Sequence, residues 1–485
     1  MAREPFVPTD APISVSGVEL QVRSEDGRRY LEVSAASPED LGGFEGEAGE
    51  AAGKVVLRGP LSSINACEIR LRVVHLRPRP VGLATSAGVG DRLGLATRGH
   101  ALAFESHGPN VVPVFAQQSI REMQRLGREP REVMDAATFG ALSAGWRHPV
   151  GADADHLKTT DDIDACLAAG FTSFTIDPGD HVRVVASDGP LSLLDMPWSA
   201  LEDDEASFLR RYRDTSSQIF PSGPPRDEDI RRAAAKYGYA VAHVVTMYRH
   251  LIARARHEVE VEVAVDETSD VTTVTEHLYF ASEMRRLGMQ WVGFAPRYVG
   301  RFEKGVEYIG DLTVLKTFFR EHAEVARAFG PYKLSLHSGS DKFSIYPLAM
   351  EATQGLLHLK TSGTSYLVAL ELVARRSPDL FREIYRISRE AYAGSRQTYQ
   401  VSADLEKAPL ASQVSDVHLL DLLHTFDSRQ ILHVGYSPAL GYVDSEGRFA
   451  ISGALRDVVI RYGAEYDEML RSYIGRHLAP LARRP

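Results

Sequence analysis

Two imidazoles and a carboxylate stand where predicted β-strands end. Asp155 and His156 close the run Gly-Ala-Asp-Ala-Asp-His at 151–156, and His337 opens the run His-Ser-Gly-Ser-Asp-Lys at 337–342. Imidazole is a common metal ligand, and a carboxylate can accept a proton. Taken singly, an Asp-His pair is more often a helix cap beside a solvated neighbour, and a lone histidine is as often a hydrogen-bonded core residue. Because both histidines follow strands, we expect them to bind a metal together.

Three more carboxylates lie at or near the end of another predicted strand, at 262, 266 and 267. Glu262 is expected inside the protein, where its pKa should be raised unless a cation lies nearby, and that would suit a general acid. Its structural alternative is an ion pair with Lys333 or Lys360. Arg297 and Lys360 are candidates for binding a substrate carboxylate, since guanidinium can do so with two hydrogen bonds. Either cation fits a purely structural counter-ion equally well.

The secondary-structure elements that should position these residues begin after Pro80, where predicted strands alternate with predicted helices. Short β-like runs are followed by helical stretches, which predicts βα units and a (β/α)8 barrel. The helices are expected near 117–127, 275–288, 313–329 and 379–393. A ninth strand candidate, 430–434, means that one assignment is wrong or lies outside the barrel. The eight strands are expected at 81–85, 111–116, 149–155, 172–177, 259–266, 291–296, 333–337 and 356–361.

The alternation of side chains between the two faces of each predicted strand indicates a polar barrel interior. In 259–266 the valines take one face and leave Glu260, Glu262 and Asp266 on the other. The apolar face must meet the helices, so the acidic face points inward. Barrel interiors are normally filled by branched apolar residues. Buried charges need partners or a metal, and the third, fifth and seventh strands can bring His156, Glu262 and His337 into one layer.

Composition bounds the class of protein. The chain has 485 residues, 44% hydrophobic and 25% charged, with a net charge of −10 and no basic face, so nucleic acid is an unexpected partner. Cys67 and Cys166 are far apart, which argues against disulfides and structural zinc. Neither a signal peptide nor a membrane span is recognised, so a cytoplasmic protein without membrane contact is expected.

Residues 1–77 are predicted to form a small α/β segment, and 78–485 the barrel, with an insertion at 178–258. A homo-oligomer remains an open alternative.

Several long segments carry a resemblance to known proteins: GDRLGLAT (90–97), VFAQQSIREM (114–123), GADADHLK (151–158), FTIDPGDHV (174–182), VDET (265–268), KLSLHSGSDKFSIYP (333–347), HLKTSGTSY (358–366) and VSADL (401–405). With them the chain resembles the tagaturonate/fructuronate epimerase family, which interconverts two ketohexuronates and requires a divalent metal. The resemblance implies Asp155 as proton acceptor, Glu262 as proton donor, and His156 and His337 as metal ligands; Zn²⁺, Mn²⁺, Co²⁺ and Ni²⁺ all remain candidates. The third ligand does not carry over. We assign substrate binding to Gln117, Asp266, Glu267, Arg297 and Lys360.

The structures of the two ketohexuronates restrict the reaction mechanisms that could interconvert them. The two ketohexuronates differ at C4, whose hydrogen is not acidic because C4 is β to the C2 carbonyl. Retro-aldol cleavage of the C3–C4 bond, rotation of the aldehyde and re-addition would invert C4. A divalent metal would stabilise the enediolate, and two acid/base groups are needed. Transient oxidation at C4 would need a nicotinamide, and no dinucleotide-binding fingerprint is present.

Other functions remain as alternatives. A 4-epimerase of neutral ketohexoses such as fructose and tagatose would use the same metal and acid/base groups. A metal hydrolase on a barrel would normally show an HxH strand motif, which is missing. A non-catalytic sugar-acid binding protein could use Arg297 and Lys360 but would have no need for Asp155 and Glu262 beside a metal.

Overall fold

The computed structural model contains a closed barrel of eight parallel strands, which confirms the predicted (β/α)8 fold. The structure describes residues 12–483 except 26, 186–192, 194, 217–225 and 445. Around the barrel the strands run in the order β10-β11-β12-β13-β6-β7-β8-β9. Their bounds are β6 Ser86–Val89, β7 Val112–Ser119, β8 Gly151–Leu157, β9 Ser173–Ile176, β10 Glu260–Ala264, β11 Gly293–Ala295, β12 Lys333–Leu336 and β13 Leu357–Thr361.

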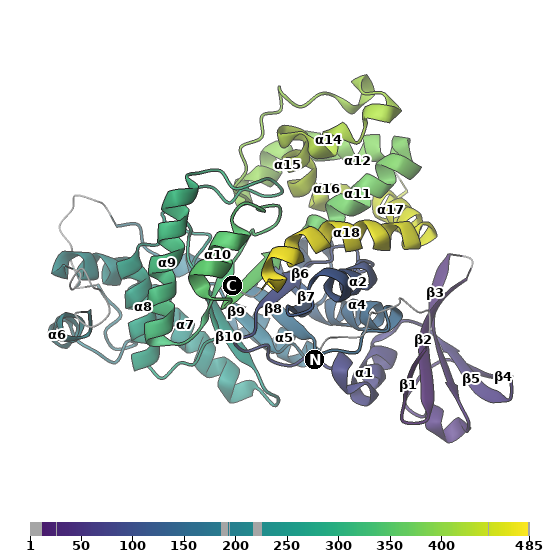
Figure 1. The fold of residues 1–485 in the computed structure, drawn as a ribbon, viewed down its shortest axis with the longest axis horizontal. Helices are drawn as coiled ribbons and strands as arrows, with labels where there is room; N and C mark the ends of the chain where they lie inside the picture. The colour runs from purple at the N-terminus through teal and green to yellow at the C-terminus, as the bar shows by residue number, and fades with distance from the viewer. Residues whose placement is uncertain are drawn as a thin grey trace.

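Before the barrel the chain forms a five-stranded antiparallel sheet in the order β1-β2-β3-β5-β4. Figure 1 shows this sheet at one side of the barrel, with the helix α1 (Ser63–Arg72) leading from it. That residues 1–77 fold as a separate unit stays a prediction. The strands are β1 Ile13–Val15, β2 Val18–Glu25, β3 Arg28–Ala35, β4 Glu47–Ala51 and β5 Lys54–Gly59.

Helices cover the barrel and one of its ends. Figure 1 shows α6–α9 on the side opposite the N-terminal sheet and α11, α12 and α14–α17 gathered at the top of the view. None of the helices in the described part of the chain is both long and apolar enough to cross a membrane. After α1 they are α2 Thr97–His107, α3 Ile120–Leu126, α4 Pro130–Ser143, α5 Thr160–Ala169, α6 Glu205–Ser216, α7 Asp227–Arg254, α8 Val274–Arg286, α9 Leu312–Phe329, α10 Tyr346–Thr353, α11 Thr364–Arg376, α12 Pro378–Glu390, α13 Tyr392–Ser395, α14 Asp421–His424, α15 Phe426–Val434, α16 Tyr436–Leu440, α17 Ala450–Arg461 and α18 Gly463–Ala482.

The strand phases were predicted correctly where the sequence alternates. Val261 and Val263 are buried in the hydrophobic core, while Glu262 faces the interior and contacts Lys360 at 2.8 Å. Local signals also fix the loops after two site-bearing strands. The helices α5 and α8 begin with capping boxes at Thr159 and Thr273, whose hydroxyls accept from the third helical N–H. Each helix therefore starts at a defined point just beyond its strand.

Three sequence assignments were wrong. The run 81–85 is a turn, because Val81 and Gly82 donate their N–H groups to the Glu260 carboxylate instead of to a strand, and β6 begins at Ser86. The helix expected from 117 begins only at Ile120, since Gln117–Ser119 continue β7 and pair with β8. The ninth strand candidate, 430–434, belongs to the helix α15. In the insertion 178–258 the described residues form the 3-10 helix Gly179–His181 and the helices α6 and α7, with turns between them. Residues 186–192, 194 and 217–225 lie outside the described part of the chain.

Candidate active site

The polar interior of the barrel is built around Lys360. Its ammonium lies 2.8 Å from carboxylate oxygens of Asp153, Asp155 and Glu262, and it donates to Thr175 Oγ1 at 2.7 Å. Lys360 is 3% exposed, so its charge is fully engaged inside the protein. This position does not favour the predicted role of Lys360 in binding a substrate carboxylate. It supports the alternative role, a counter-ion for buried carboxylates.

Lys360 is also the nearby cation on which the expected pKa of Glu262 depended. Burial alone would raise the pKa of this carboxyl, but the charge of Lys360 and the hydrogen bond from His337 lower it well below its usual value. The pKa of Asp155 is also lowered, because Lys360 and His156 outweigh the effect of burial. For Asp153, burial dominates and raises the pKa to about 6. Because a cation lies beside Glu262, its pKa is not raised, and the ion pair with Lys360 that was named as the structural alternative is the one that forms.

Above this layer, two histidines meet at the mouth of the barrel. His337 Nδ1 lies 3.2 Å from His156 Nε2 and 3.2 Å from Asp266 Oδ1. Asp266 Oδ1 is also 4.0 Å from His156 Nε2. Donor atoms of Asp155, His156 and His337 all lie within 4.8 Å of one another. The predicted convergence of both histidines with the carboxylates is thus present in the structure.

His156 reaches the mouth through a break in the alternation of β8. Asp153 and Asp155 face inward, so the next residue should face the helices. His156 instead has a φ of 55°, and the pairing of β8 with β9 shifts register between Ala154 and Leu157. A left-handed conformation is costly for a residue with a side chain and is typical of functional sites. Here it turns the imidazole over the barrel.

A carboxylate behind each imidazole selects which nitrogen faces the cavity. His156 Nδ1 is hydrogen-bonded to Asp177 at 3.0 Å, and His337 Nε2 to Glu262 at 2.7 Å. This leaves His156 Nε2 and His337 Nδ1 facing each other. Metal-bound histidines generally have such an outer carboxylate, which orients the ring. Asp177 was not among the predicted site residues, although its position at the end of a strand was a signal that could have found it.

The charges at the mouth fit a divalent cation. Burial would lower the pKa of both imidazoles, yet the surrounding carboxylates raise the pKa of His337 to about 9 and that of His156 well above its usual value. The site therefore attracts positive charge strongly. Two nitrogens and a carboxylate oxygen are a donor set that Zn²⁺ and other first-row divalent ions accept. The residues present fit the metal that the sequence suggested.

A cavity of about 340 Å³ opens directly over this site. Its wall includes His337, Asp266 and Arg297, together with Lys304, which donates to Ser338 Oγ at 2.7 Å. Lys304 lies on a loop without a recognisable motif, so sequence reasoning missed it. The remaining predicted substrate residues lie nearby: Gln117 donates to Asp155 at 3.0 Å, and Glu267 forms an ion pair with Arg121 at 2.6 Å.

Comparison with known proteins decides the family. The model of the tagaturonate epimerase family UxaE matches residues 22–481. The chain belongs to this family. It is 38% identical over 425 residues to the tagaturonate/fructuronate epimerase of Thermotoga maritima, covering 86% of each chain. The native crystal structure of fructuronate-tagaturonate epimerase from Cohnella laeviribosi matches the present chain with a TM-score of 0.89 and 31% identity, over 97% of this chain and 95% of the other. A one-glycerol complex of the same Cohnella enzyme gives the same values.

Proposed function

We propose that this epimerase interconverts tagaturonate and fructuronate by inverting C4 and that it requires a divalent metal. The observation that carries the proposal is the meeting of His156 Nε2 and His337 Nδ1, 3.2 Å apart, beneath a cavity large enough for a sugar acid. The relatives from Thermotoga maritima and Cohnella laeviribosi are named for these two substrates, which supports the same assignment here.

For the metal, we propose His156, His337 and Asp266 as ligands. Asp266 Oδ1 approaches both ring nitrogens, whereas Asp155 is already held by Lys360 at 2.8 Å and by Gln117 at 3.0 Å. When bound, a divalent ion would supply Lewis-acid stabilisation of the negative charge that forms on the C2 and C3 oxygens of the substrate. Asp177 and Glu262 would then hold the two imidazoles in place.

Asp155 is the proposed proton acceptor. Its lowered pKa keeps it ionised at neutral pH, so it can accept the C4 hydroxyl proton as the C3–C4 bond breaks. The bonding electrons pass to C3 and the C2 carbonyl, which gives an enediolate, and C4 becomes an aldehyde carbon. Rotation of this aldehyde, re-formation of the C3–C4 bond on its other face and return of the proton from Asp155 to the new C4 oxygen give the epimer and the ionised carboxylate. No external oxidant or reductant is consumed.

Glu262 receives a different role from the one implied by the family resemblance. An ionised carboxylate that is bonded to both Lys360 and His337 has no proton to give. We propose that it positions His337. Glu262→Gln should therefore weaken metal binding by roughly 10–100-fold, as other outer carboxylate partners do. Loss of turnover with unchanged metal affinity would restore Glu262 as the proton donor.

Arg297 and Lys304 are proposed to bind the substrate carboxylate, because both line the cavity above the histidines. The function is tested by following tagaturonate by NMR with the purified protein. Fructuronate should appear with metal present, disappear after chelation, and return when a divalent ion is added back. Full activity of metal-free protein would contradict the metal requirement, and absence of fructuronate from metal-loaded protein would contradict the substrate. A cytoplasmic location, without nucleic-acid or membrane partners, stays a prediction from the sequence.

A further inference from the structure

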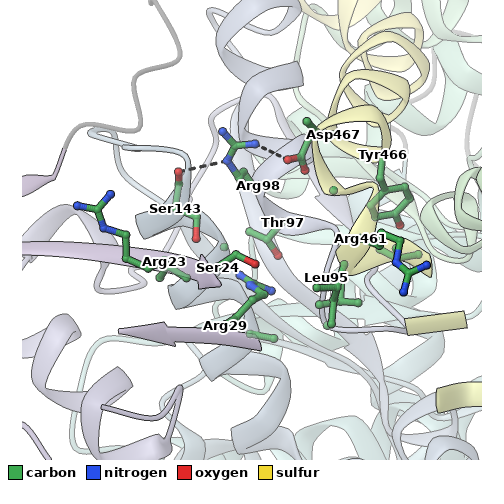
Figure 2. A pocket seen from close by; sticks show the side chains of 18 of the residues that line it. Arg23, Ser24, Arg29, Leu95, Thr97, Arg98, Ser143, Arg461, Tyr466 and Asp467 are labelled. Atoms are coloured by element: carbon green, nitrogen blue, oxygen red, sulfur yellow. Dashed lines mark hydrogen bonds and ion pairs between the residues drawn. The ribbon is translucent and has the colours of Figure 1, made fainter. Parts of the chain in front are cut away.

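A second cleft lies outside the barrel mouth, between the N-terminal sheet and the barrel. It has two compartments of about 470 and 550 Å³ that share Arg29, Gly94, Leu95, Ala136 and Ile460. Figure 2 shows the first compartment, with Arg29 from the sheet on one side and Arg461 and Asp467 from the C-terminal helices on the other. We call the joined compartments the arginine cleft, after Arg29, Arg98, Arg128 and Arg456, which line it.

The charges of the cleft are not balanced. Arg98 forms an ion pair with Asp467, visible in Figure 2, and Asp135 pairs with Arg70 at 2.9 Å. Arg29, Arg128 and Arg456 differ, because no carboxylate of the described residues lies within ion-pair distance of them. Three cationic side chains therefore line one cleft without an anionic partner.

The hydrogen bonds of these arginines leave donors available. Arg128 donates to the carbonyls of Asp91 at 2.6 Å and Glu132 at 3.4 Å and to Gln118 at 3.1 Å, and Arg456 donates to the Leu93 carbonyl. Within the described part of the chain, the side chain of Arg29 donates no hydrogen bond. A guanidinium carries five N–H donors, so each arginine retains several for a ligand. The groups that accept these hydrogen bonds are uncharged carbonyl and amide oxygens, so they do not neutralise the arginines.

The arginines also repel one another. Burial lowers the pKa of Arg29, the carboxylates Asp467 and Asp91 oppose this, and Arg456 and Arg98 lower it further. Burial likewise lowers the pKa of Arg128; Asp91 and Glu132 oppose this, and Arg456 lowers the pKa further. An anion placed among these groups would relieve the repulsion. In a half-buried cleft this attraction is screened less than on an open surface.

We propose that the arginine cleft binds a small molecule carrying a phosphate group, held by Arg29, Arg128 and Arg456. Guanidinium binds phosphate with two parallel hydrogen bonds, and a dianion matches several unpaired cations better than one carboxylate does. The apolar side chains Leu61, Phe139 and Ile460 line the same cleft and can contact the rest of the ligand. Its size lies in the range of ligand sites. This site is separate from the epimerase reaction and does not depend on the proposed function.

The test uses thermal unfolding of the full-length protein with inorganic phosphate and glycerol phosphate at constant ionic strength. Both probes should raise the melting temperature in a saturable manner. Arg29→Gln and Arg456→Gln should each raise the half-saturating concentration by about tenfold or more, because charge-assisted hydrogen bonds are lost. Arg456 is exposed, so its variant is informative even if Arg29→Gln fails to fold. Arg320→Gln, an exposed change on α9, is the matched control and should respond like the wild type.

Three outcomes would overturn the proposal. The first is an unchanged half-saturating concentration in the Arg456 variant. The second is loss of the response in Arg297→Gln, because phosphate would then bind at the barrel mouth. The third is saturation by citrate at lower concentration than by either phosphate compound, which would assign the cleft to polycarboxylates.

Discussion

Replacing Lys360 by methionine tests the polar barrel interior most severely. The change keeps the side-chain length and removes the ammonium that contacts Asp153, Asp155 and Glu262, each at 2.8 Å. Breaking a buried ion pair by removing one partner costs about 3–5 kcal/mol, because the remaining charge is left uncompensated. We expect a loss of folding free energy in this range. The loss of folding free energy should not be three times as large because three carboxylates are involved, since protonation of some of them limits the repulsion.

Urea denaturation of metal-free protein, followed by circular dichroism, measures this loss. Lys316→Met is the control, because Lys316 forms an exposed ion pair with Glu351 at 3.0 Å, and surface pairs contribute about 0–1 kcal/mol. The pH dependence has a defined sign. Lys360 lowers the pKa of Asp155 and Glu262, so its contribution is present above the unfolded pKa values near 4 and shrinks as the pH falls through them. A destabilisation no larger than that of the control at pH 7 would refute the role of Lys360.

The other predictions concern metal and substrate. Asp177→Asn should lower metal affinity by roughly 10–100-fold in calorimetric titration, because it removes the partner of His156 Nδ1. An unchanged affinity would show that Asp177 does not hold His156 in place for the metal. Asp266→Asn should abolish tight metal binding, whereas Asp155→Asn should keep the metal and lower kcat by about 10²–10⁴-fold. The reverse pattern would exchange their roles. Arg297→Gln should raise the KM for tagaturonate much more than that for neutral tagatose, and equal changes would contradict a carboxylate contact.

Strand phase explains why much of the barrel interior could be predicted from the sequence. The valines of 259–265 and the polar residues between them obey the two-residue period of a strand, so Glu262 was placed correctly inside. The third, fifth and seventh strands brought His337 and the carboxylates together as expected. Lys360, however, is too long a side chain for phase alone to show where its ammonium ends. Its ion pair with Glu262 was named as one of two structural alternatives, but its simultaneous contacts with Asp153 and Asp155 were not foreseen.

Backbone conformations and loops account for what could not be predicted. His156 enters the site only because its φ is positive and β8 shifts register, and neither follows from a periodic pattern. Lys304 comes from the loop between β11 and α9, where the sequence carries no periodic signal. The run 81–85 resembles a strand in composition, but its backbone is hydrogen-bonded to the distant Glu260. Such contacts across 179 residues are set by the fold and not by local sequence.

The mechanism is tested most directly with tagaturonate deuterated at C4 in ordinary water. Retro-aldol cleavage breaks the C3–C4 bond and never the C4–H bond, so metal-loaded enzyme should form fructuronate that retains the label, without bound nicotinamide. NMR of substrate and product measures the label, and absorbance of the purified protein checks for nicotinamide. Loss of deuterium to solvent during conversion would contradict carbon–carbon cleavage and would indicate proton abstraction at C4 instead.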